Sequence, residues 1–401
     1  MRILLVTHGF PRHADDPAGA FLLALARGQQ GLGHEITVVA PHAPGVPERD
    51  TVSGVSVRRY RYGPDETESL AYAGTMHEQV LHSWAARGRL LRLLAAQRLA
   101  VGRAVADLRP AVVNVHWWFP GGLAVWPRLR AAPPCVLTSH GTDLFLLDRF
   151  RAVRAVAGPV FRSAREVTVI SSPLVDRVRS LGVAADRIAV IPMPLTAEVF
   201  GSSPAGAEVA RAPGRLLFVG RLVERKGPEY AVRALALLRA RARQATLTLV
   251  GDGPEREPLA ALARSLGVDD AVSFTGALAP RDVADQYRRA SALVLPAVTD
   301  WKGEQEGFGM VLVEAMLSGL PVVATRSGGI PDIISDGETG FLVPERDADA
   351  LAGAVARVLG DQQLAERIGR RAAEEVARRF APEAIARRFD EVYVRATGGV
   401  L

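Results

Sequence analysis

The sequence predicts an α/β protein of two doubly wound domains, each built on a parallel sheet with helices on both faces. The chain has 401 residues, more than the roughly 250–300 at which a single hydrophobic core stops growing. Short β-branched runs alternate with longer helical patterns from end to end, which is typical of parallel strands joined by crossover helices. This alternation restarts after Pro194–Gly214, a stretch rich in proline, glycine, alanine and serine that predicts a linker.

The first half of the chain predicts six buried strands, at Ile3–Val6, Ile36–Ala40, Val112–His116, Cys135–Ser139, Val167–Ile170 and Ile188–Pro192. An amphipathic helix is expected after the first strand, at about Gly19–Gly31. Residues 52–60, interrupted by a glycine, predict a hairpin, and residues 66–109 predict a helical region. We assign residues 1–195 to an N-terminal domain.

The second half predicts five strands, at Leu216–Val219, Thr246–Val250, Val272–Thr275, Ala292–Leu295 and Val322–Ala324. Residues 215–381 form the second domain, and residues 196–214 form the linker. The last 50 residues predict helices, and the helix at about 382–401 is expected to pack back onto the first domain. Ligands of such sheets bind beyond the carboxyl ends of the strands, so we expect these loops to line a cleft between the two domains.

Composition limits the partners. The net charge is +6, and of 49 basic residues only Lys226 and Lys302 are lysines. The arginines are spread along the chain without forming runs, so no nucleic-acid partner is predicted. The lone cysteine, Cys135, fits a reducing compartment. No signal peptide is recognisable, and the weakly charged stretch Gly307–Thr325 is too interrupted to span a membrane. We expect a cytoplasmic protein.

Leucine and arginine alternate along Arg87–Arg109, and two interpretations remain open. The stretch is either a core-facing helix with a solvated arginine face or a helix that rests on an anionic bilayer. The second interpretation implies weak peripheral association with the inner face of a membrane. The sequence does not predict an oligomeric state.

The segment from Glu306 to Glu314 is the most informative. Its glycine-rich loop leads directly into an apolar helix, Met310–Leu317, whose first N–H groups form an anion site that suits a diphosphate. Eight helical residues span about 12 Å, which is comparable to the reach of a nucleotide sugar. Glu306 can therefore bond sugar hydroxyls while Glu314 accepts ribose hydroxyls. The alternative is a glycine turn and a core helix with two solvated glutamates.

A second segment, Gly220–Gly227, follows a predicted strand. Its Arg221 can bond phosphate oxygens through a planar fork, and its Lys226 can act as a compact point charge. A leaving diphosphate needs such stabilisation when no metal supplies it. The alternative is a solvated basic loop. Taken together, the two segments predict a clamp for a diphosphate.

These residues resemble a known family. Glu306 and Glu314 match the E-x7-E motif of retaining glycosyltransferases, and the loop with Arg221 and Lys226 matches their phosphate clamp. Three further segments are similar, at Thr7–Phe21, Gly31–Glu35 and Gly328–Asp332. The chain resembles glycosyltransferase family 4, the glycosyl transferases group 1, over nearly its whole length. The resemblance implies the GT-B fold and retaining transfer of a hexosyl sugar from an NDP-sugar donor to a hydroxyl of a glycan precursor or small metabolite. It implies no metal and no other cofactor.

The resemblance also implies that residues 1–195 form the acceptor-side domain and residues 215–381 the nucleotide-sugar-binding domain. It implies roles for individual residues as well. Glu306 and His140 would be the catalytic residues, with His140 bonding the donor sugar. The donor would be bound by Gly19, Arg221, Lys226, Leu278, Phe308, Gly309, Met310, Val311 and Glu314. In this set Arg221 and Lys226 would hold the diphosphate, Glu314 the ribose, and the region of Leu278 the base. From the residues alone, His140 is equally a packed loop histidine.

Acceptor-side candidates follow two strands of the first domain, at His116, Trp117, Trp118 and Asp143. Aromatic faces suit stacking on a sugar or cyclitol ring, although a hydrophobic plug under the loop is an equal alternative. Asp143 either orients its loop or touches the acceptor. Two rival functions stay open, namely an NDP-sugar epimerase of the same fold and a non-catalytic binding subunit.

Overall fold

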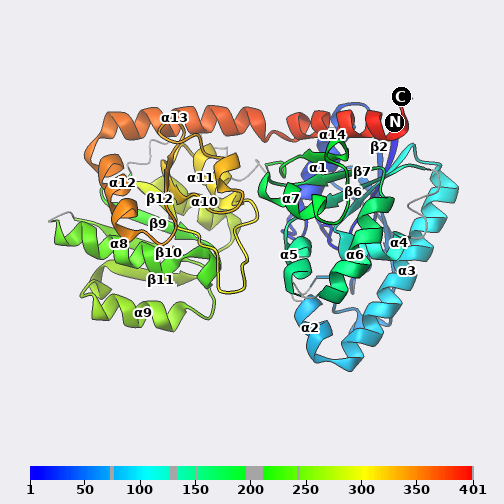
Figure 1. Ribbon diagram of the computed structural model, residues 1–401, viewed down its shortest axis with the longest axis horizontal. Coiled ribbons are helices and arrows are strands. Elements are labelled where there is room, and N and C mark those ends of the chain that lie inside the picture. Colours follow the sequence, from blue (N-terminus) through cyan, green and yellow to red (C-terminus); the bar gives the residue numbers. More distant parts are fainter. Residues whose placement is uncertain (73–75, 127–132, 150, 196–210, 242–243, 400–401) are drawn as a thin grey trace. The chain divides into compact units, whose positions relative to one another are not determined.

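The computed structural model describes residues 1–72, 76–126, 133–149, 151–195, 211–241 and 244–399. The chain forms two compact units, coloured along the sequence in Figure 1. Unit 1 comprises Met1–Pro194 and Pro382–Leu401, and unit 2 comprises Leu195–Ala381. Most of the predicted linker, residues 196–210, lies outside the described residues, and its last four residues belong to unit 2.

Unit 1 is built on an eight-stranded sheet in the order β3-β4-β2-β1-β5-β6-β7-β8. Neighbouring strands are parallel except in the β3–β4 hairpin, which is antiparallel as predicted. Helices cover both faces of the central strands, so these strands are buried on both sides and read as continuous apolar runs. The strands are β1 (Arg2–Val6), β2 (Glu35–Pro41), β3 (Arg49–Val52), β4 (Val55–Tyr60), β5 (Val112–His116), β6 (Cys135–Ser139), β7 (Glu166–Val169) and β8 (Ile188–Val190).

The helices of unit 1 are α1 (Ala20–Gly31), α2 (Met76–His82), α3 (Trp84–Leu108), α4 (Leu123–Val125), α5 (Thr142–Arg149), α6 (Arg151–Ser163), α7 (Pro173–Arg179) and α14 (Pro382–Thr397). The prediction of one helical region over residues 66–109 was wrong in part. A 3₁₀ turn ends at Thr67, and α3 starts anew after Ser83, whose backbone is extended. The Ser83 hydroxyl accepts the Ala86 N–H at 3.3 Å, and this side-chain cap explains the break.

The C-terminal helix α14 is part of the core of unit 1, where it packs against α1. The Tyr393 side chain is fully buried. Its hydroxyl accepts hydrogen bonds from Gln29 Nε2 and Asn114 Nδ2, both at 2.9 Å. One buried hydroxyl therefore joins α14 to α1 and to the central strand β5, through two amide groups that are far from it in the sequence.

Unit 2 is built on a six-stranded parallel sheet in the order β11-β10-β9-β12-β13-β14. Its strands are β9 (Arg215–Val219), β10 (Thr246–Val250), β11 (Val272–Gly276), β12 (Ala292–Leu295), β13 (Val322–Thr325) and β14 (Phe341–Val343). Its helices are α8 (Pro228–Ala240), α9 (Arg256–Ser265), α10 (Pro280–Arg289), α11 (Met310–Leu317), α12 (Ala348–Gly360) and α13 (Gln362–Arg379). The edge strand β14 was not predicted, because three residues are too few to show a period. Among the described residues, no helix is long and apolar enough to cross a membrane.

Both sheets have a point where the strand order reverses. In unit 1 the chain runs outward from β1 through β2 on one side and from β5 through β6 on the other. In unit 2 the same reversal separates β9 from β12. Loops that follow strands at such a point part from each other, which makes it the usual place for a ligand in an α/β sheet. The predicted site residues come mainly from these loops.

Candidate functional site

In unit 2 the loops that follow β9 and β12 meet in an ion pair. Lys226 Nζ lies 2.5 Å from Glu306 Oε2, and both side chains are largely buried. Burial by itself raises the pKa of the Glu306 carboxyl. The charges of Lys226 and Arg225, together with the Phe308 N–H, outweigh it and lower the pKa below its usual value. Glu306 is therefore an ionised carboxylate, and Lys226 is held against it.

The position of Lys226 depends on the glycine that follows it. Gly227 has φ 64°, ends the 3₁₀ turn at Glu224–Lys226 and precedes α8. A Cβ at this position would lie 1.8 Å from the carbonyl oxygen of Pro296, so the two loops touch backbone to backbone. Only glycine allows this approach, and the approach brings Lys226 to the loop that carries Glu306.

The segment Gly328–Asp332 supports Glu306 from the other side. The Gly329 N–H donates to the Glu306 carbonyl at 3.0 Å. Gly328 has φ 51°, and a Cβ there would lie 2.0 Å from the same carbonyl oxygen. Packing thus explains the two glycines of the Gly-Gly-Ile-Pro-Asp sequence, because a side chain at Gly328 would collide with the backbone carbonyl of Glu306.

The helix α11 starts three residues after Gly307, with Gly309 as its N-cap at φ 102°. No side chain caps this end, and its first turn contains no acidic residue. Phe308 is buried and packs edge-on against Phe380, which anchors the turn. The N-cap and the first turn of α11 therefore leave the positive end of the helix dipole without a side-chain cap of their own, which suits an anion site, and the Glu306 carboxylate contacts the Phe308 N–H just before it.

Glu314 lies one turn further along α11, where it is half-buried. The Tyr287 hydroxyl donates to Glu314 Oε2 at 2.9 Å. Burial raises the pKa of the Glu314 carboxyl, and the Tyr287 hydrogen bond and the Lys226 charge oppose this rise. The alternative of two solvated glutamates was therefore wrong. Tyr287, on α10, is a supporting residue that the sequence did not reveal, because it lies 27 residues away.

Arg221 and Leu278 lie in the loops after β9 and β11. The Arg221 side chain is exposed and has no ion pair with a described residue, whereas Leu278 is half-buried. Sequence reasoning missed Arg225, which pairs with Glu304 at 2.9 Å and acts on the pKa of Glu306. The position of Arg225 directly before Lys226 in the sequence could have identified it as part of the site. Unit 2 thus has a buried Lys226–Glu306 pair near the N-terminus of α11. The exposed Arg221 lies on the same loop as Lys226.

In unit 1 the loops after β1 and β6 and the last residue of β5 bring three histidines into one aromatic cluster. His116 Nδ1 lies 3.0 Å from His140 Nε2, and their rings are stacked. The Trp117 ring centroid lies 4.2 Å from that of His140 and 4.4 Å from that of His8. Phe21, from the first turn of α1, packs on His140 at 5.1 Å. His8 was not predicted, and its place directly after β1 was the signal for it.

These histidines are neutral and incompletely hydrogen-bonded. Burial lowers the pKa of His8 to about 4 and that of His116 to about 3, and it also lowers that of His140 well below its usual value. His8 Nδ1, His116 Nε2 and His140 Nδ1 are buried and have no hydrogen-bond partner among the described residues. Buried polar atoms are normally paired, so the cluster offers three uncharged nitrogens to a ligand.

Asp143 orients the loop that carries His140. Its carboxylate accepts hydrogen bonds from the Ser139 hydroxyl at 2.7 Å, the Trp118 N–H at 3.0 Å and the His140 N–H at 3.2 Å. The side chain is 3% exposed, so of the two roles left open the structure supports orientation. Trp118 is buried and donates from Nε1 to the Asp143 carbonyl at 2.6 Å, as a plug residue does.

Trp117 differs from its neighbour. It is half-buried and has φ 63°, a conformation that non-glycine residues rarely adopt. Strained backbone of this kind gathers at functional sites, and here it turns the indole toward His8 and His140. Gly19, the residue before α1, is the N-cap of a helix that again has no side-chain cap and no acidic first turn.

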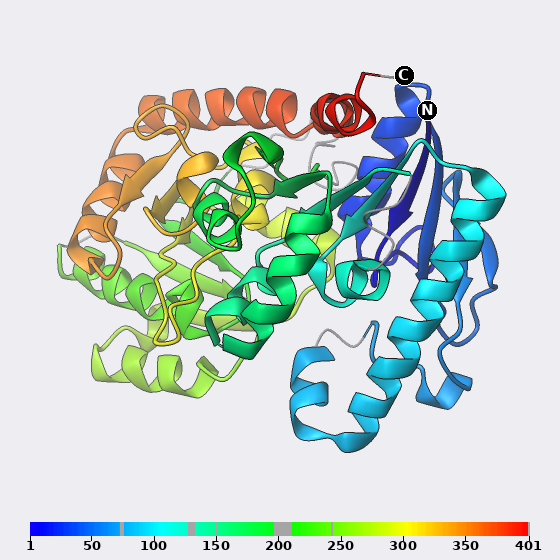
Figure 2. The ribbon, with the colours of Figure 1, turned by 45° about the vertical axis from the view of Figure 1, so that its right-hand side comes forward.

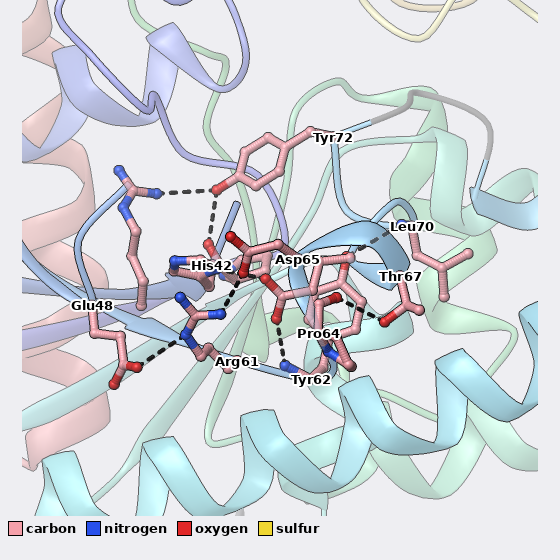
Figure 3. A network of polar contacts seen from close by, with 12 residues as sticks. His42, Glu48, Arg61, Tyr62, Pro64, Asp65, Thr67, Leu70 and Tyr72 are labelled. Atoms are coloured by element: carbon pink, nitrogen blue, oxygen red, sulfur yellow. Dashed lines mark hydrogen bonds and ion pairs between the residues drawn. The ribbon is translucent and has the colours of Figure 1, made fainter. Parts of the chain in front are cut away.

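Unit 1 also contains a polar network in the segments that follow β2 and β4, drawn in Figure 3. His42, Asp65 and Glu68 are the one group of such side chains, among the described residues, whose ligand atoms lie close enough to hold a metal. Glu68 already accepts from His42 Nδ1 at 2.5 Å and from the Tyr62 N–H at 2.8 Å, and Asp65 accepts from Arg61. The group is therefore satisfied by protein donors, and the absence of a metal stays a prediction.

The histidine cluster predicts how stability depends on pH. The folded pKa values lie below the unfolded value of 6.5, so the unfolded chain binds more protons between them. The contribution of these histidines to the free energy of unfolding is therefore fully present above the unfolded pKa. Below it, each histidine lowers the free energy of unfolding by up to about 1.4 kcal/mol for every pH unit. Calorimetry from pH 7 to about pH 5 should show a shallower fall in melting temperature for His116→Asn than for the exposed control His13→Asn. Equal slopes would contradict the prediction.

The sequence and the fold of this chain are similar to those of known glycosyltransferases. Residues 208–375 match the family described as Glycosyl transferases group 1, and residues 18–194 match the Glycosyl transferase 4-like domain. A mannosyltransferase of Mycobacterium tuberculosis, GDP-mannose-dependent alpha-(1-6)-phosphatidylinositol monomannoside mannosyltransferase, is 33% identical over 261 residues, 63% of this chain and 68% of that protein. The chain belongs to the group 1 glycosyltransferases. Glycogen synthase of the same species is 29% identical over 417 residues, which cover 100% of this chain and 96% of the relative.

Solved glycosyltransferase structures share the GT-B fold of this chain. Sucrose-phosphate synthase from Thermosynechococcus elongatus superposes with a TM-score of 0.75 at 24% identity, over 100% of both chains. HepE from Anabaena, in complex with UDP-glucose, gives a TM-score of 0.68 at 20% identity over 98% of both chains. The catalytic domain of starch synthase IV from Arabidopsis thaliana, bound to ADP and acarbose, gives 0.72 at 13% identity over 99% of both chains.

Proposed function

We propose that this glycosyltransferase moves a hexosyl sugar from an NDP-sugar donor to an acceptor hydroxyl, with retention of configuration and without a metal. The observation that carries the proposal is the Lys226–Glu306 pair at 2.5 Å, next to the uncapped start of α11. A cation and a row of N–H groups suit a diphosphate, and the ionised Glu306, four residues before the start of α11, suits the hydroxyls of the attached sugar.

The diphosphate is the part of the donor that this site would recognise. One relative has GDP-mannose in its name, and structural neighbours contain UDP, UDP-glucose or ADP. Their bases and sugars differ while the diphosphate is common to all of them. Lys226 and the α11 N–H groups would bind that common part, with Arg221 from the same loop and Glu314 on the ribose. The region of Leu278 would contact the base.

In the proposed reaction the bond between the anomeric carbon and the diphosphate oxygen breaks, and the acceptor oxygen bonds to the same face of that carbon. Lys226, Arg221 and the start of α11 would stabilise the negative charge that develops on the leaving group. A phosphate oxygen would take the acceptor proton. Neutral His140 would bond a sugar hydroxyl, in the role that family resemblance assigns to it, and Trp117 with His116 would face the acceptor.

The two lysines of the chain provide a matched test of donor binding. Lys226→Ala should weaken the binding of UDP, GDP or ADP by about 10- to 100-fold, because a charge-assisted contact is worth about 1.5–3 kcal/mol. Lys302→Ala removes the same charge from an exposed lysine of the same unit and should leave the affinity unchanged. Isothermal titration is run first in EDTA, because the proposal needs no metal, and is then repeated with an excess of a divalent cation.

Two outcomes would contradict the proposal. Equal affinities of the two lysine variants would remove Lys226 from the diphosphate site. Binding that appears only after a divalent cation is added would replace direct recognition with metal-assisted recognition. Incubation of the donor without an acceptor separates the rival epimerase, which would change the sugar of the donor when no acceptor is present.

A further inference from the structure

The surface of α3 has an apolar stripe that faces away from the core of unit 1. Trp84 is 83% exposed, Leu91 68% and Leu99 58%. These are three of the six exposed large apolar side chains among the described residues. Together with the exposed Ala95 and Ala106 they recur at intervals of four and seven residues, which places them on one side of an α-helix.

The opposite side of α3 is already used for folding. Ala86, Leu93, Gln97, Val101 and Ala104 are its buried residues, and this side packs against β1, β2 and β4. Figure 2 shows α3, in cyan, on the surface of unit 1. A helix needs only one apolar side to join a core, so the exposed apolar stripe has no role in the packing of unit 1.

Arginines border the stripe on both sides. Helical spacing places Arg87 and Arg98 along one border and Arg92 and Arg103 along the other, each pair eleven residues apart. All four side chains are exposed, and Arg87 stacks over the Trp84 ring at 4.2 Å. No acidic residue occurs between Trp84 and Ala106, and Asp107 at the end of the helix pairs with Arg58 at 2.8 Å. The face is therefore purely basic and apolar.

We propose that this α3 face, formed by Trp84, Leu91, Ala95, Leu99 and Ala106 with the bordering arginines, docks the protein on an anionic phospholipid bilayer. A tryptophan suits the headgroup region, leucines enter the acyl boundary, and arginines on both borders meet lipid phosphates. Charge complementarity selects the lipid over a second copy of the chain, since two such faces would repel each other. The inference goes beyond the proposed transfer reaction and does not depend on it.

Flotation of the full chain with vesicles tests this docking without any activity measurement. Binding to phosphatidylcholine vesicles that contain phosphatidylglycerol should exceed binding to pure phosphatidylcholine by at least about tenfold, and high salt should reduce it. The triple variant Trp84→Ser, Leu91→Ser, Leu99→Ser should lose most of this binding. Its matched control replaces the other exposed apolar residues, Val156, Leu266 and Trp301, with serine and should bind like the unchanged protein.

A second pair of variants tests the charge. Replacing Arg92, Arg98 and Arg103 with glutamine should abolish the preference for phosphatidylglycerol, whereas the same change at Arg264, Arg370 and Arg378, exposed arginines of unit 2, should preserve it. All substituted side chains are on the surface, and equal melting temperatures verify the fold. Binding that is the same for the α3 variants and their controls would overturn the proposal. So would a dimer, measured by light scattering, that only the α3 serine variant converts to monomers.

Discussion

Glu306→Gln is expected to lower turnover by about 10²- to 10³-fold, the usual effect of removing one preorganised electrostatic contact from a transition state. Glutamine keeps the shape of the side chain but removes the charge that faces Lys226 at 2.5 Å. The affinity for a nucleoside diphosphate should stay the same or increase, because Lys226 is released from its anionic partner. The variant therefore separates a role in the reaction from a role in diphosphate binding.

Glu304→Gln is the matched control for this variant. Glu304 lies two residues earlier on the same loop and pairs with Arg225 at 2.9 Å, so its substitution removes an equal charge from a neighbouring ion pair. Its turnover should remain within a few-fold of the unchanged enzyme. If Glu306→Gln and Glu304→Gln had the same turnover, Glu306 would have no special part in the reaction.

His140→Ala is expected to reduce turnover by about 10²-fold, a typical loss for one positioned polar group in an active site. His140 presents a buried Nδ1 that no described residue hydrogen-bonds, next to Trp117 and His116. Nucleoside diphosphate affinity should not change, because the residues proposed to hold the diphosphate belong to unit 2. This pattern distinguishes contact with the sugar from a general loss of structure.

The control for His140→Ala is His13→Ala, which removes an exposed imidazole from the same unit and should leave turnover unchanged. A His140→Ala enzyme with near-normal turnover would make His140 a packed loop histidine, which was the alternative from the residues alone. A weakened nucleoside diphosphate affinity in that variant would instead show that the substitution disturbs more than the sugar contact.

Much of the fold was predictable because the central strands are buried on both faces. Such strands read as unbroken apolar runs, as in Ile3–Val6 and Leu216–Val219, and they recur at the spacing of crossover helices. The helix Met310–Leu317 was predicted with its observed bounds, since glycine marks both of its ends in the sequence. β14 was missed because three residues carry no periodic signal, and the break before α3 was missed because a single serine causes it.

The site was predictable where chemistry-bearing residues follow a strand directly. Lys226 and Glu306 were both expected near a diphosphate, but their mutual ion pair was not, because it depends on two loops meeting at Gly227 and Pro296. The support of Glu314 by Tyr287 was likewise hidden by distance along the chain. Long-range partners of this kind follow from strand order, which local sequence does not determine.

A crystal structure with UDP or GDP bound would show whether a donor diphosphate binds at the start of α11 against Lys226. We predict phosphate oxygens within about 3 Å of Lys226 Nζ and of the Met310 and Val311 N–H groups, with Lys226 moved away from Glu306. A diphosphate bound elsewhere, with Lys226 and Glu306 still paired, would contradict this prediction.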